Sequence, residues 1–406
     1  MSIPVRRANA LFHDTWLPDE TRRIRAEVRE FAESVLRPQA HRLNTTPESV
    51  DSFPRDIFDA MAQAGLYQIP FSADVGGRGL EFPTLATLTV LEELAYFSAG
   101  VASALYDGQA ILVGKTLEQA PEPLRSKYLP QLVHGGFVGS FATSEPEAST
   151  DLSAATMKTV AEKVTSGYRV NGRKRWITNS VAADYILVLV RTGDKQTMLL
   201  VDMRSEGVSV GVPDRKMGNH AQLTADVYLN DVFVPDEQLV GVEGGGLRVA
   251  LGALTLGRMG IGAIGVAMAQ AAFDFSADYM SQRKIFGQEL ARFQHWQFTY
   301  AEHAMGIENA RNLYQKAAFR YDREGEAEIE AAMAKLYGSR LAVDMARDAI
   351  QVCGGYGFVR ELSATGQQFP LEAIYRDAKI GEIYEGANEI QRWIIARQIF
   401  GRTLAG

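Results

Sequence analysis

The chain contains very little of what a disulfide framework, a metal centre or a nucleic-acid surface requires. Its single cysteine, Cys353, excludes any disulfide within the chain and is typical of a protein from a reducing compartment. The six histidines are scattered, with no pair at metal-ligand spacing, so the sequence predicts no zinc or iron site. Acidic residues outnumber basic ones by 49 to 42, a net charge of -7, and this balance argues against general nucleic-acid binding.

Long apolar runs and targeting segments are also missing. The sequence has no stretch of about 18 consecutive apolar residues, so it predicts no membrane insertion. Residues 1–17 combine Arg6 and Arg7 with Asp14 and lack an apolar core, unlike a secretory signal. We therefore expect a cytoplasmic protein.

The bulk composition and its changes along the chain indicate an enzyme of several domains. Hydrophobic residues make up 46% and charged residues 22% of 406 residues, ordinary values for a globular protein of two or three domains. Helical spacing dominates residues 1–136, strand-like runs occupy 137–246, and helical patterns return over 247–406. Helices, strands and helices in separate blocks predict an α+β protein of three domains rather than a doubly wound sheet.

The middle segment has the pattern of a small antiparallel sheet. Tyr168 to Val170, then Asn171-Gly172, then Arg173 to Ile177 predict a β-hairpin with a tight turn. Further short strands are expected at residues 185–190, 198–201, 208–212 and 225–229.

Residues 260–265 read Gly-Ile-Gly-Ala-Ile-Gly and match the G-x-G-x-x-G pattern of dinucleotide-binding turns. That pattern needs a preceding strand and an acidic residue about 20 positions later, where this sequence has Ile285 in helical surroundings. We therefore interpret the glycines as small residues that let one long helix pack closely against a neighbour.

Glu385 lies in the most informative run of the chain, residues 383–392, Ile-Tyr-Glu-Gly-Ala-Asn-Glu-Ile-Gln-Arg. Asn388 and Gln391 have the spacing of a helix cap and its partner, which places Glu385 in a short loop at a helix entrance. Together with Arg-Asp-Ala-Lys-Ile at residues 376–380, this run closely resembles the C-terminal signature of the acyl-CoA dehydrogenases, in which the glutamate is the catalytic base.

The resemblance covers essentially the whole chain and implies a fold and a cofactor. The implied fold has a helical N-terminal domain, a middle β-barrel or β-sandwich domain and a C-terminal four-helix bundle, and the implied cofactor is FAD. Residues 141–151 resemble the family's flavin-side loop, and residues 176–179, Trp-Ile-Thr-Asn, resemble the segment whose indole and hydroxyl contact the flavin. The flavin contacts implied on this side are Phe141, Thr143, Ser144, Trp176 and Thr178.

Two further segments resemble the parts of the family that hold the ADP portion of FAD from a neighbouring subunit. Arginine suits a phosphate, and glycines let backbone amides approach an anion closely. The residues so assigned are Arg283, Phe286, Gln294, Gln351, Gly354 and Gly355. The resemblance therefore implies a cofactor site shared across an interface, in a homotetramer built as a dimer of dimers. Gly354 is equally typical of a helix C-terminal stop.

At the substrate, the resemblance implies that Glu385 removes the α-proton of an acyl-CoA thioester while a β-hydride passes to the flavin, giving a trans-2-enoyl-CoA. The implied substrate contacts are Arg258, Tyr106, Tyr384 and Gly386. The implied electron acceptor is an electron-transfer flavoprotein. Some family members carry their base just before the position of Arg258, but residues 254–257 hold no carboxylate. Apolar surroundings would raise the pKa of Glu385 and the following helix start would lower it.

Alternative functions share these motifs. The same fold serves enoyl-CoA reductases and flavin-dependent monooxygenases or oxidases, and a non-catalytic flavoprotein is a further alternative. The retained Glu385 argues against a monooxygenase, which does not need this base. The sequence leaves open the acyl chain length, branching, the direction of reaction and the choice between CoA and an acyl-carrier protein. Tyr106 is bulky and favours a short or unusual acyl group.

Overall fold

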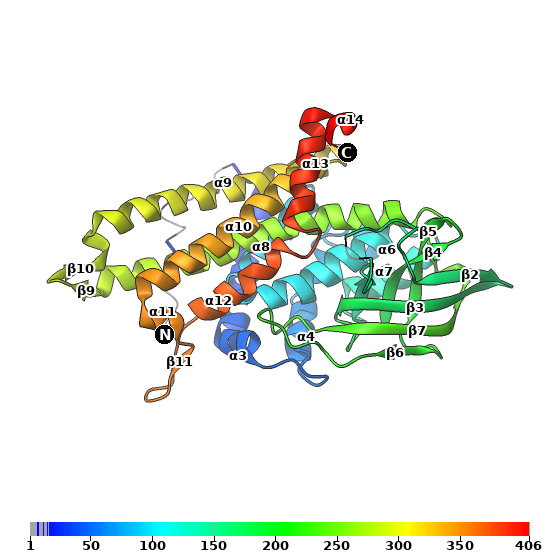
Figure 1. Cartoon of the computed structure of the whole chain (residues 1–406), viewed down its shortest axis with the longest axis horizontal. Coiled ribbons are helices and arrows are strands. Elements are labelled where there is room, and N and C mark those ends of the chain that lie inside the picture. The colour runs from blue at the N-terminus through cyan, green and yellow to red at the C-terminus, as the bar shows by residue number, and fades with distance from the viewer. Residues whose placement is uncertain (1–5, 8–10, 12–13, 15, 149, 406) are drawn as a thin grey trace.

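A computed structural model gives the fold and describes residues 6–7, 11, 14, 16–148 and 150–405. Most of the N-terminal segment considered for a targeting signal, and position 149 of the flavin-side loop, lie outside the described residues. Figure 1 shows a helical N-terminal region, a sheet at one end of the molecule and a bundle of long helices, in the predicted order. The predicted α+β class is confirmed.

The N-terminal region consists of helices that surround two largely apolar ones. α5 (Pro83–Ala95) and the π-helical segment η5 (Val101–Lys115) are buried along most of their length, because their apolar residues are not confined to one face. The surrounding elements are α2 (Asp19–Phe31), η1 (Ala32–Leu36), η2 (Arg37–Gln39), α3 (Ala40–Thr45), α4 (Arg55–Gln63), η3 (Leu66–Gln68), η4 (Ala73–Val75), α6 (Thr116–Glu118) and α7 (Leu124–Val133).

Glu92 of α5 connects this region to the C-terminal helices. Its buried carboxylate accepts hydrogen bonds from Arg25 of α2 at 3.1 Å and from Arg311 of α9 (Gln294–Glu324) at 2.9 Å. Both arginines are buried as well, so each charge has the partner that compensates its desolvation. The N-terminal region is therefore docked on the helical bundle by buried charge pairs.

The middle region forms one eight-stranded sheet with the strand order β6-β7-β3-β2-β4-β5-β8, and β1 pairs in parallel with β4. The strands are β1 (Gly139–Ala142), β2 (Val160–Val164), β3 (Gly167–Thr178), β4 (Tyr185–Thr192), β5 (Lys195–Asp202), β6 (Val208–Val210), β7 (Thr224–Pro235) and β8 (Leu239–Val240), with η6 (Asp236–Gln238) before the last. The four short strands predicted after the hairpin are confirmed as β4 to β7.

The hairpin predicted at Asn171-Gly172 is wrong. β3 runs without interruption through these residues, and it pairs with β2 across a turn that contains Ser166, whose φ is 62°. Gly172 permits a close approach instead, since a Cβ at this position would lie 2.5 Å from the Cα of Thr159. The Asn-Gly pair therefore marks a register shift between β3 and β7.

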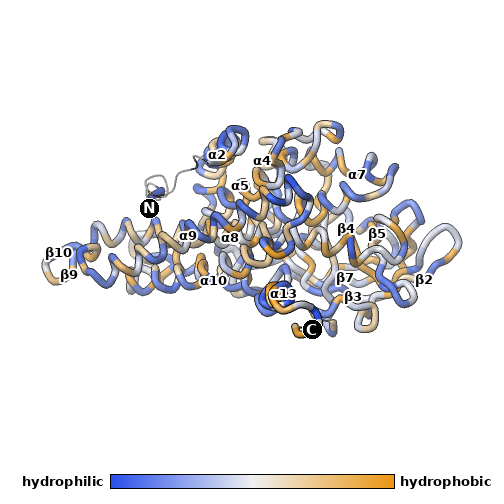
Figure 2. Tube along the Cα trace, turned by 90° about the horizontal axis from the view of Figure 1, so that it is seen from above, coloured by the Kyte–Doolittle hydropathy of each residue, from blue (hydrophilic) through white to orange (hydrophobic). Residues whose placement is uncertain are grey.

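Three long helices dominate the C-terminal region: α8 (Gly246–Gln282), α9 and α10 (Glu328–Cys353). The remaining elements are β9 (Lys284–Ile285), β10 (Gln288–Glu289), η7 (Leu290–Arg292), α11 (Gly355–Phe358), β11 (Glu361–Leu362), β12 (Gln367–Gln368), α12 (Leu371–Ala378), η8 (Lys379–Glu382), α13 (Asn388–Phe400) and α14 (Arg402–Ala405). Figure 2 shows α2, α4 and α5 on one side of α8 and α13 on the other.

Small residues determine the contact between α8 and α10. A Cβ at Gly265 would lie 2.5 Å from the backbone oxygen of Gly338, and one at Gly262 would lie 3.0 Å from the backbone of Ala334. Residues 260–265 therefore lie in mid-helix and permit close packing, as predicted, and they form no dinucleotide-binding turn.

α8 is also the one helix, within the part of the chain that the structure describes, that is long and apolar enough to cross a membrane. Of its apolar 18-residue window, 78% is buried inside the protein, and the helix packs on α5, α9 and α10. A core helix meets the same criteria, so the length and composition of α8 agree with its central position.

Candidate active site

The loop ahead of α13, which carries Glu385, lies near the middle of the molecule (Figure 1). The backbone φ of Glu385 is 55°, a left-handed conformation that few residues other than glycine adopt, and Gly386 follows with a φ of 85°. Such strain persists where the surrounding structure enforces it, and it is enriched at functional sites. The loop therefore holds the Glu385 carboxylate in one direction.

The cap predicted for α13 is wrong. The residue before the helix is Ala387, and Asn388 is the first residue of the helix. Asn388 turns its side chain to α10, where Oδ1 accepts a hydrogen bond from Nζ of the buried Lys335 at 2.9 Å. Gln391 donates from Nε2 to the carbonyl oxygen of Gly386 at 2.7 Å. Both side chains therefore hold the Glu385 loop to its surroundings, and neither caps the helix end.

The Glu385 carboxylate lies against α8. A Cβ at Gly257 would lie 2.5 Å from Oε2 of Glu385, so only glycine leaves this space to the carboxylate. Oε2 is buried and has no hydrogen-bond partner among the described residues. Arg258 lies beside the same loop, since a Cβ at Gly386 would be 3.8 Å from its Nε, and this Nε also lacks a partner in the described chain. Two buried groups of opposite charge are therefore available to a ligand.

Burial brings the pKa of the Glu385 carboxyl group near neutral pH. Burial raises the pKa of Glu385 to about 7, although Arg258 and Lys335 act in the opposite direction. Burial also lowers the pKa of Lys335 to about 7, and Glu385 partly offsets this effect. A general base works best when its pKa lies near the operating pH. Burial, which the sequence predicted to raise the pKa of Glu385, therefore outweighs the charges of Arg258 and Lys335.

A second carboxyl group, that of Asp107 on η5, lies close to the first. Asp107 is 2% exposed, and a Cβ at Gly260 would lie 2.6 Å from its Oδ1. Burial, and after it the nearby Glu385, raise the pKa of Asp107 well above its ordinary value. Gly257 and Gly260 are three residues apart on α8 and share one face, so both carboxyl groups lie along that face.

Tyr106, predicted to contact the substrate, is fully buried and stacks on Tyr67 with 6.2 Å between the ring centroids. Its bulk is thus accommodated inside the N-terminal region. Tyr384, the residue before Glu385, lies near both carboxyl groups, since burial and then the charges of Asp107 and Glu385 raise the pKa of Tyr384. Sequence reasoning assigned no role to Asp107, although a carboxylate within an apolar helical segment is a usable signal.

The loop after β1 meets strand β3 where the flavin is predicted to bind. The backbone N–H of Arg175 donates to the carbonyl oxygen of Ser144 at 3.0 Å. Lys174 and Glu145 are both buried and form an ion pair at 2.8 Å. Glu145 also accepts hydrogen bonds from the backbone N–H groups of residues 158 and 159, at 2.6 and 3.0 Å. The buried pair therefore connects the flavin-side loop to β3.

Trp176 presents an open aromatic surface beside this loop. It has a φ of 57° at a register shift of β3, and 56% of the residue is exposed. Phe141 lies in β1 and Thr143 follows that strand, which contacts β3. An exposed indole offers a surface that a planar ring system can cover.

Thr178, at the end of β3, is connected to the C-terminal signature by hydrogen bonds. Its Oγ1 accepts from Nε2 of Gln222 at 3.0 Å, and Oε1 of Gln222 accepts from Nδ2 of Asn219 at 2.9 Å. The backbone N–H of Asn219 donates to Oδ1 of the buried Asp377 at 2.6 Å. Motif reasoning missed Gln222 because its partner Thr178 is 44 positions away in the sequence.

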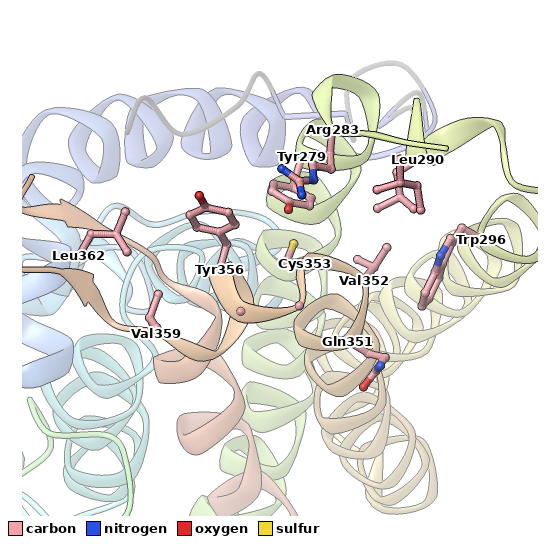
Figure 3. Close-up of a pocket in the computed structure, with 13 residues that line it drawn as sticks. Tyr279, Arg283, Leu290, Trp296, Gln351, Val352, Cys353, Tyr356, Val359 and Leu362 are labelled. Carbon is pink, nitrogen blue, oxygen red and sulfur yellow. The ribbon is translucent and has the colours of Figure 1, made fainter. Parts of the chain in front are cut away.

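A pocket of about 590 Å³ lies where α8 and α10 end. Thirteen residues line it, and four of them are predicted FAD contacts: Arg283, Gln351, Gly354 and Gly355. Figure 3 shows Arg283 and Tyr279 at the end of α8, above the turn that carries Cys353 and Tyr356. The structure therefore brings together the two segments that the sequence predicted to hold the ADP portion of FAD.

Phe286 and Gln294 lie next to this pocket without lining it. Phe286 is 94% exposed at the tip of the β9/β10 hairpin, and Gln294 begins α9. The hairpin lies at one end of the bundle, and the sheet lies at the other (Figure 1). The predicted contacts of one FAD molecule are therefore divided between the two ends of a single chain.

The residues at both ends fit their part of an FAD molecule. The exposed indole of Trp176 suits the flat flavin ring, and Arg283 suits the pyrophosphate. Gly354 has a φ of 56°, and no atom lies within 4 Å of the position of a Cβ on Gly354 or Gly355. The backbone at this turn therefore leaves space for the close approach of an anion, although the N–H of Gly354 donates to the carbonyl oxygen of Gln351 at 3.3 Å.

Comparison with known proteins shows which family the chain belongs to. The profiles of the acyl-CoA dehydrogenase N-terminal, middle and C-terminal domains match residues 18–136, 140–232 and 244–400. The chain belongs to the acyl-CoA dehydrogenase family. An acyl-CoA dehydrogenase of Bacillus subtilis is 34% identical over 94% of this chain and 98% of its own length. A short-chain specific acyl-CoA dehydrogenase of Clostridium acetobutylicum is 34% identical over 95% of this chain and 99% of its own length.

A solved structure of the acyl-CoA dehydrogenase family has the same fold as this chain. Butyryl-CoA dehydrogenase from Megasphaera elsdenii superposes with a TM-score of 0.88 at 31% identity, covering 95% of this chain and 100% of that one. Members of the family are FAD flavoproteins, so the chain is an FAD-dependent oxidoreductase. The predicted family, enzyme class and cofactor are confirmed.

Proposed function

We propose that the chain removes two hydrogens from the α and β carbons of a short acyl-CoA thioester and forms a trans-2-enoyl-CoA. The observation that carries this proposal is the Glu385 carboxylate, which a strained loop holds with Oε2 buried and without a partner among the described residues. Acyl-CoA substrates accord with the family. Two relatives described above are named for short-chain and butyryl substrates, which supports a short acyl group.

Glu385 takes the α-proton in this proposal. Its pKa near 7 leaves a large ionised fraction at neutral pH, and the transferred proton satisfies the oxygen that otherwise lacks a partner. Arg258 and Lys335 favour the ionised form before transfer. The backbone N–H of Glu385 is the donor that polarises the thioester carbonyl in the family. FAD, when bound, supplies the acceptor for the β-hydride.

The hydrogen bonds of Gln222 position a second group for the same reaction, the hydroxyl of Thr178. They fix the hydroxyl of Thr178, the group that the family places near the reacting nitrogen of the flavin. Because Asn219 and Asp377 continue these contacts, the flavin side and the C-terminal signature are positioned relative to each other.

We further propose a homotetramer, a dimer of dimers, that passes its electrons to an electron-transfer flavoprotein. The supporting observation is the division of the predicted FAD contacts between the two ends of one chain, since a second copy would complete the site. We also propose a cytoplasmic location, supported by the single, buried and unpaired Cys353.

Anaerobic titration with acyl-CoAs tests the proposed reaction. The purified flavoprotein should be bleached stoichiometrically by one group within a panel of short, medium, branched and aromatic acyl-CoAs, with short chains the most effective. Bound FAD that none of them reduces would contradict dehydrogenation and favour the reductase or monooxygenase chemistry of this fold. A purified protein without FAD would contradict the cofactor assignment.

Replacing Lys335 with glutamine should change the pH dependence of catalysis. In the wild type, kcat/KM should rise as the pH increases through about 7 and level off above it, because only ionised Glu385 accepts a proton. Glutamine keeps a hydrogen-bond donor for Asn388 but removes a cation that lowers the pKa of Glu385. The midpoint should therefore move to higher pH, by about one pH unit.

Lys379→Gln is the matched control for this measurement. Lys379 lies on η8, close in sequence to the base, but its side chain is 51% exposed and pairs with Glu382. Its loss should leave the midpoint of the kcat/KM profile unchanged. A Lys335→Gln profile that coincides with the wild type would show that Lys335 has no electrostatic effect on the base.

A further inference from the structure

Asp107 is a buried acid in an apolar helical segment. η5 is buried along most of its length, and Asp107 is 2% exposed. Its Oδ1 has no hydrogen-bond partner among the described residues, and within the same part of the chain no lysine or arginine forms an ion pair with it. Buried polar atoms are nearly always hydrogen-bonded, so an unpaired carboxyl oxygen requires an explanation.

The position of Asp107 relative to Glu385 follows from α8. A Cβ at Gly257 would lie 2.5 Å from Oε2 of Glu385, and a Cβ at Gly260 would lie 2.6 Å from Oδ1 of Asp107. Three residues of helix span about 4.5 Å, so the two oxygens lie roughly one turn apart along the same face. Both oxygens lack partners in the described structure, which makes them two anchor points of one buried site.

Two leucines lie beside these oxygens, next to the polar neighbours Tyr384 and Arg258 already described. The same Cβ at Gly260 would lie 2.9 Å from Cδ1 of Leu91, and the Cβ at Gly257 would lie 3.3 Å from Cδ2 of Leu112. A plain hydrocarbon chain would pack against Leu91 and Leu112 but would leave Oδ1 of Asp107 without a hydrogen bond. An acyl group that also carries a hydrogen-bond donor would pack against the two leucines and pair with Oδ1.

We propose that Asp107 selects acyl groups that carry a hydrogen-bond donor, a hydroxyl or a protonated amine, about one helical turn from the carbon that Glu385 deprotonates. The inference rests on the proposed function, because it takes Glu385 to mark the α-carbon. A carboxylate accepts from an ammonium or a hydroxyl, and a protonated carboxyl group still accepts from a hydroxyl through its carbonyl oxygen. A site built to pair a polar group rejects the analogue that lacks it, since its own polar atom then stays unpaired.

Binding to the Glu385→Gln holoenzyme tests this inference without turnover. Titration calorimetry would compare butyryl-CoA with 4-hydroxybutyryl-CoA and 4-aminobutyryl-CoA, which place a donor on the third carbon beyond the carbonyl. At least one of the two should bind about tenfold or more tightly than butyryl-CoA. Preference for the ammonium would indicate an ionised Asp107, and preference for the hydroxyl a protonated one.

Asp107→Leu in the same Glu385→Gln background should reverse this order, with butyryl-CoA binding more tightly than in the parent. Asp107→Asn keeps an acceptor without a charge, so it should retain the hydroxyl compound and lose any preference for the ammonium. FAD content and melting temperature of each variant confirm folding. Equal binding of all three ligands, the same order in parent and Asp107→Leu proteins, or no binding at all would overturn the inference.

The two proposals fail in different ways. Butyryl-CoA could bleach the wild-type flavin while the order of ligand affinities is the same with and without Asp107. The dehydrogenase assignment would then stand, and the proposed selectivity of Asp107 would be wrong. If the donor-bearing ligands bind through Asp107 but no acyl-CoA bleaches the flavin, the selectivity stands and the direction or type of reaction is wrong.

Discussion

Replacing Glu385 with glutamine is expected to slow flavin reduction by an acyl-CoA at least ~10³-fold. Glutamine has the shape of glutamate but cannot accept the α-proton at neutral pH. The loop itself should persist, because Asn388 and Gln391 hold it through contacts that do not involve the Glu385 side chain. Stopped-flow absorbance of the flavin measures the rate, and FAD content and melting temperature should equal those of the wild type.

Glu389→Gln is the matched control for this substitution. Glu389 lies four positions later at the start of α13, and its side chain is 77% exposed. In the Glu389→Gln variant, the acyl-CoA should reduce the flavin at the wild-type rate. A Glu385→Gln enzyme that keeps more than about a tenth of the wild-type rate would contradict the assignment of the base. Asp107, the other buried carboxyl group of the site, would then be the residue to examine.

Glu145→Ala is expected to lower the free energy of unfolding by about 3–5 kcal/mol and to reduce the FAD content. The substitution leaves Lys174 buried, and among the described residues only the carbonyl oxygen of Thr143, 3.3 Å from Nζ, remains as its partner. Burial already lowers the pKa of Lys174 to about 8, so Lys174 loses its proton easily when its partner is removed. The loss in free energy of unfolding should therefore lie near the lower end of the expected range. The flavin-side loop loses its connection to β3, the strand that carries Trp176, which explains the effect on the cofactor.

The opposite half of the ion pair should be less sensitive. Lys174→Met leaves Glu145 with two backbone N–H donors, at 2.6 and 3.0 Å, so its loss of stability should be clearly smaller. Urea unfolding measures both variants. Glu389→Ala, which removes an exposed pair with Arg392, should change stability by less than ~0.5 kcal/mol. Equal losses from Glu145→Ala and Glu389→Ala would contradict a structural role for the buried pair.

Local sequence patterns predicted much of this protein and failed where tertiary contacts override them. Asn171-Gly172 has the composition of a tight turn, yet it lies within β3 because β2 and β7 pair along both sides of that strand. Asn388 has the composition of a cap, yet Lys335 offers a buried donor that binds its side chain. In both cases the partner comes from another element, which no local pattern contains.

The sequence by itself determined the order of helical and strand regions, the motif that carries Glu385 and the rejection of a dinucleotide-binding turn. These features depend on spacing along the chain, which a reader of the sequence sees directly. Only the tertiary structure decided that burial prevails over the charges around Glu385, that Gln222 holds Thr178, and that Asp107 lies beside the base. The physical reason is that desolvation and through-space electrostatics depend on which distant segments are packed together.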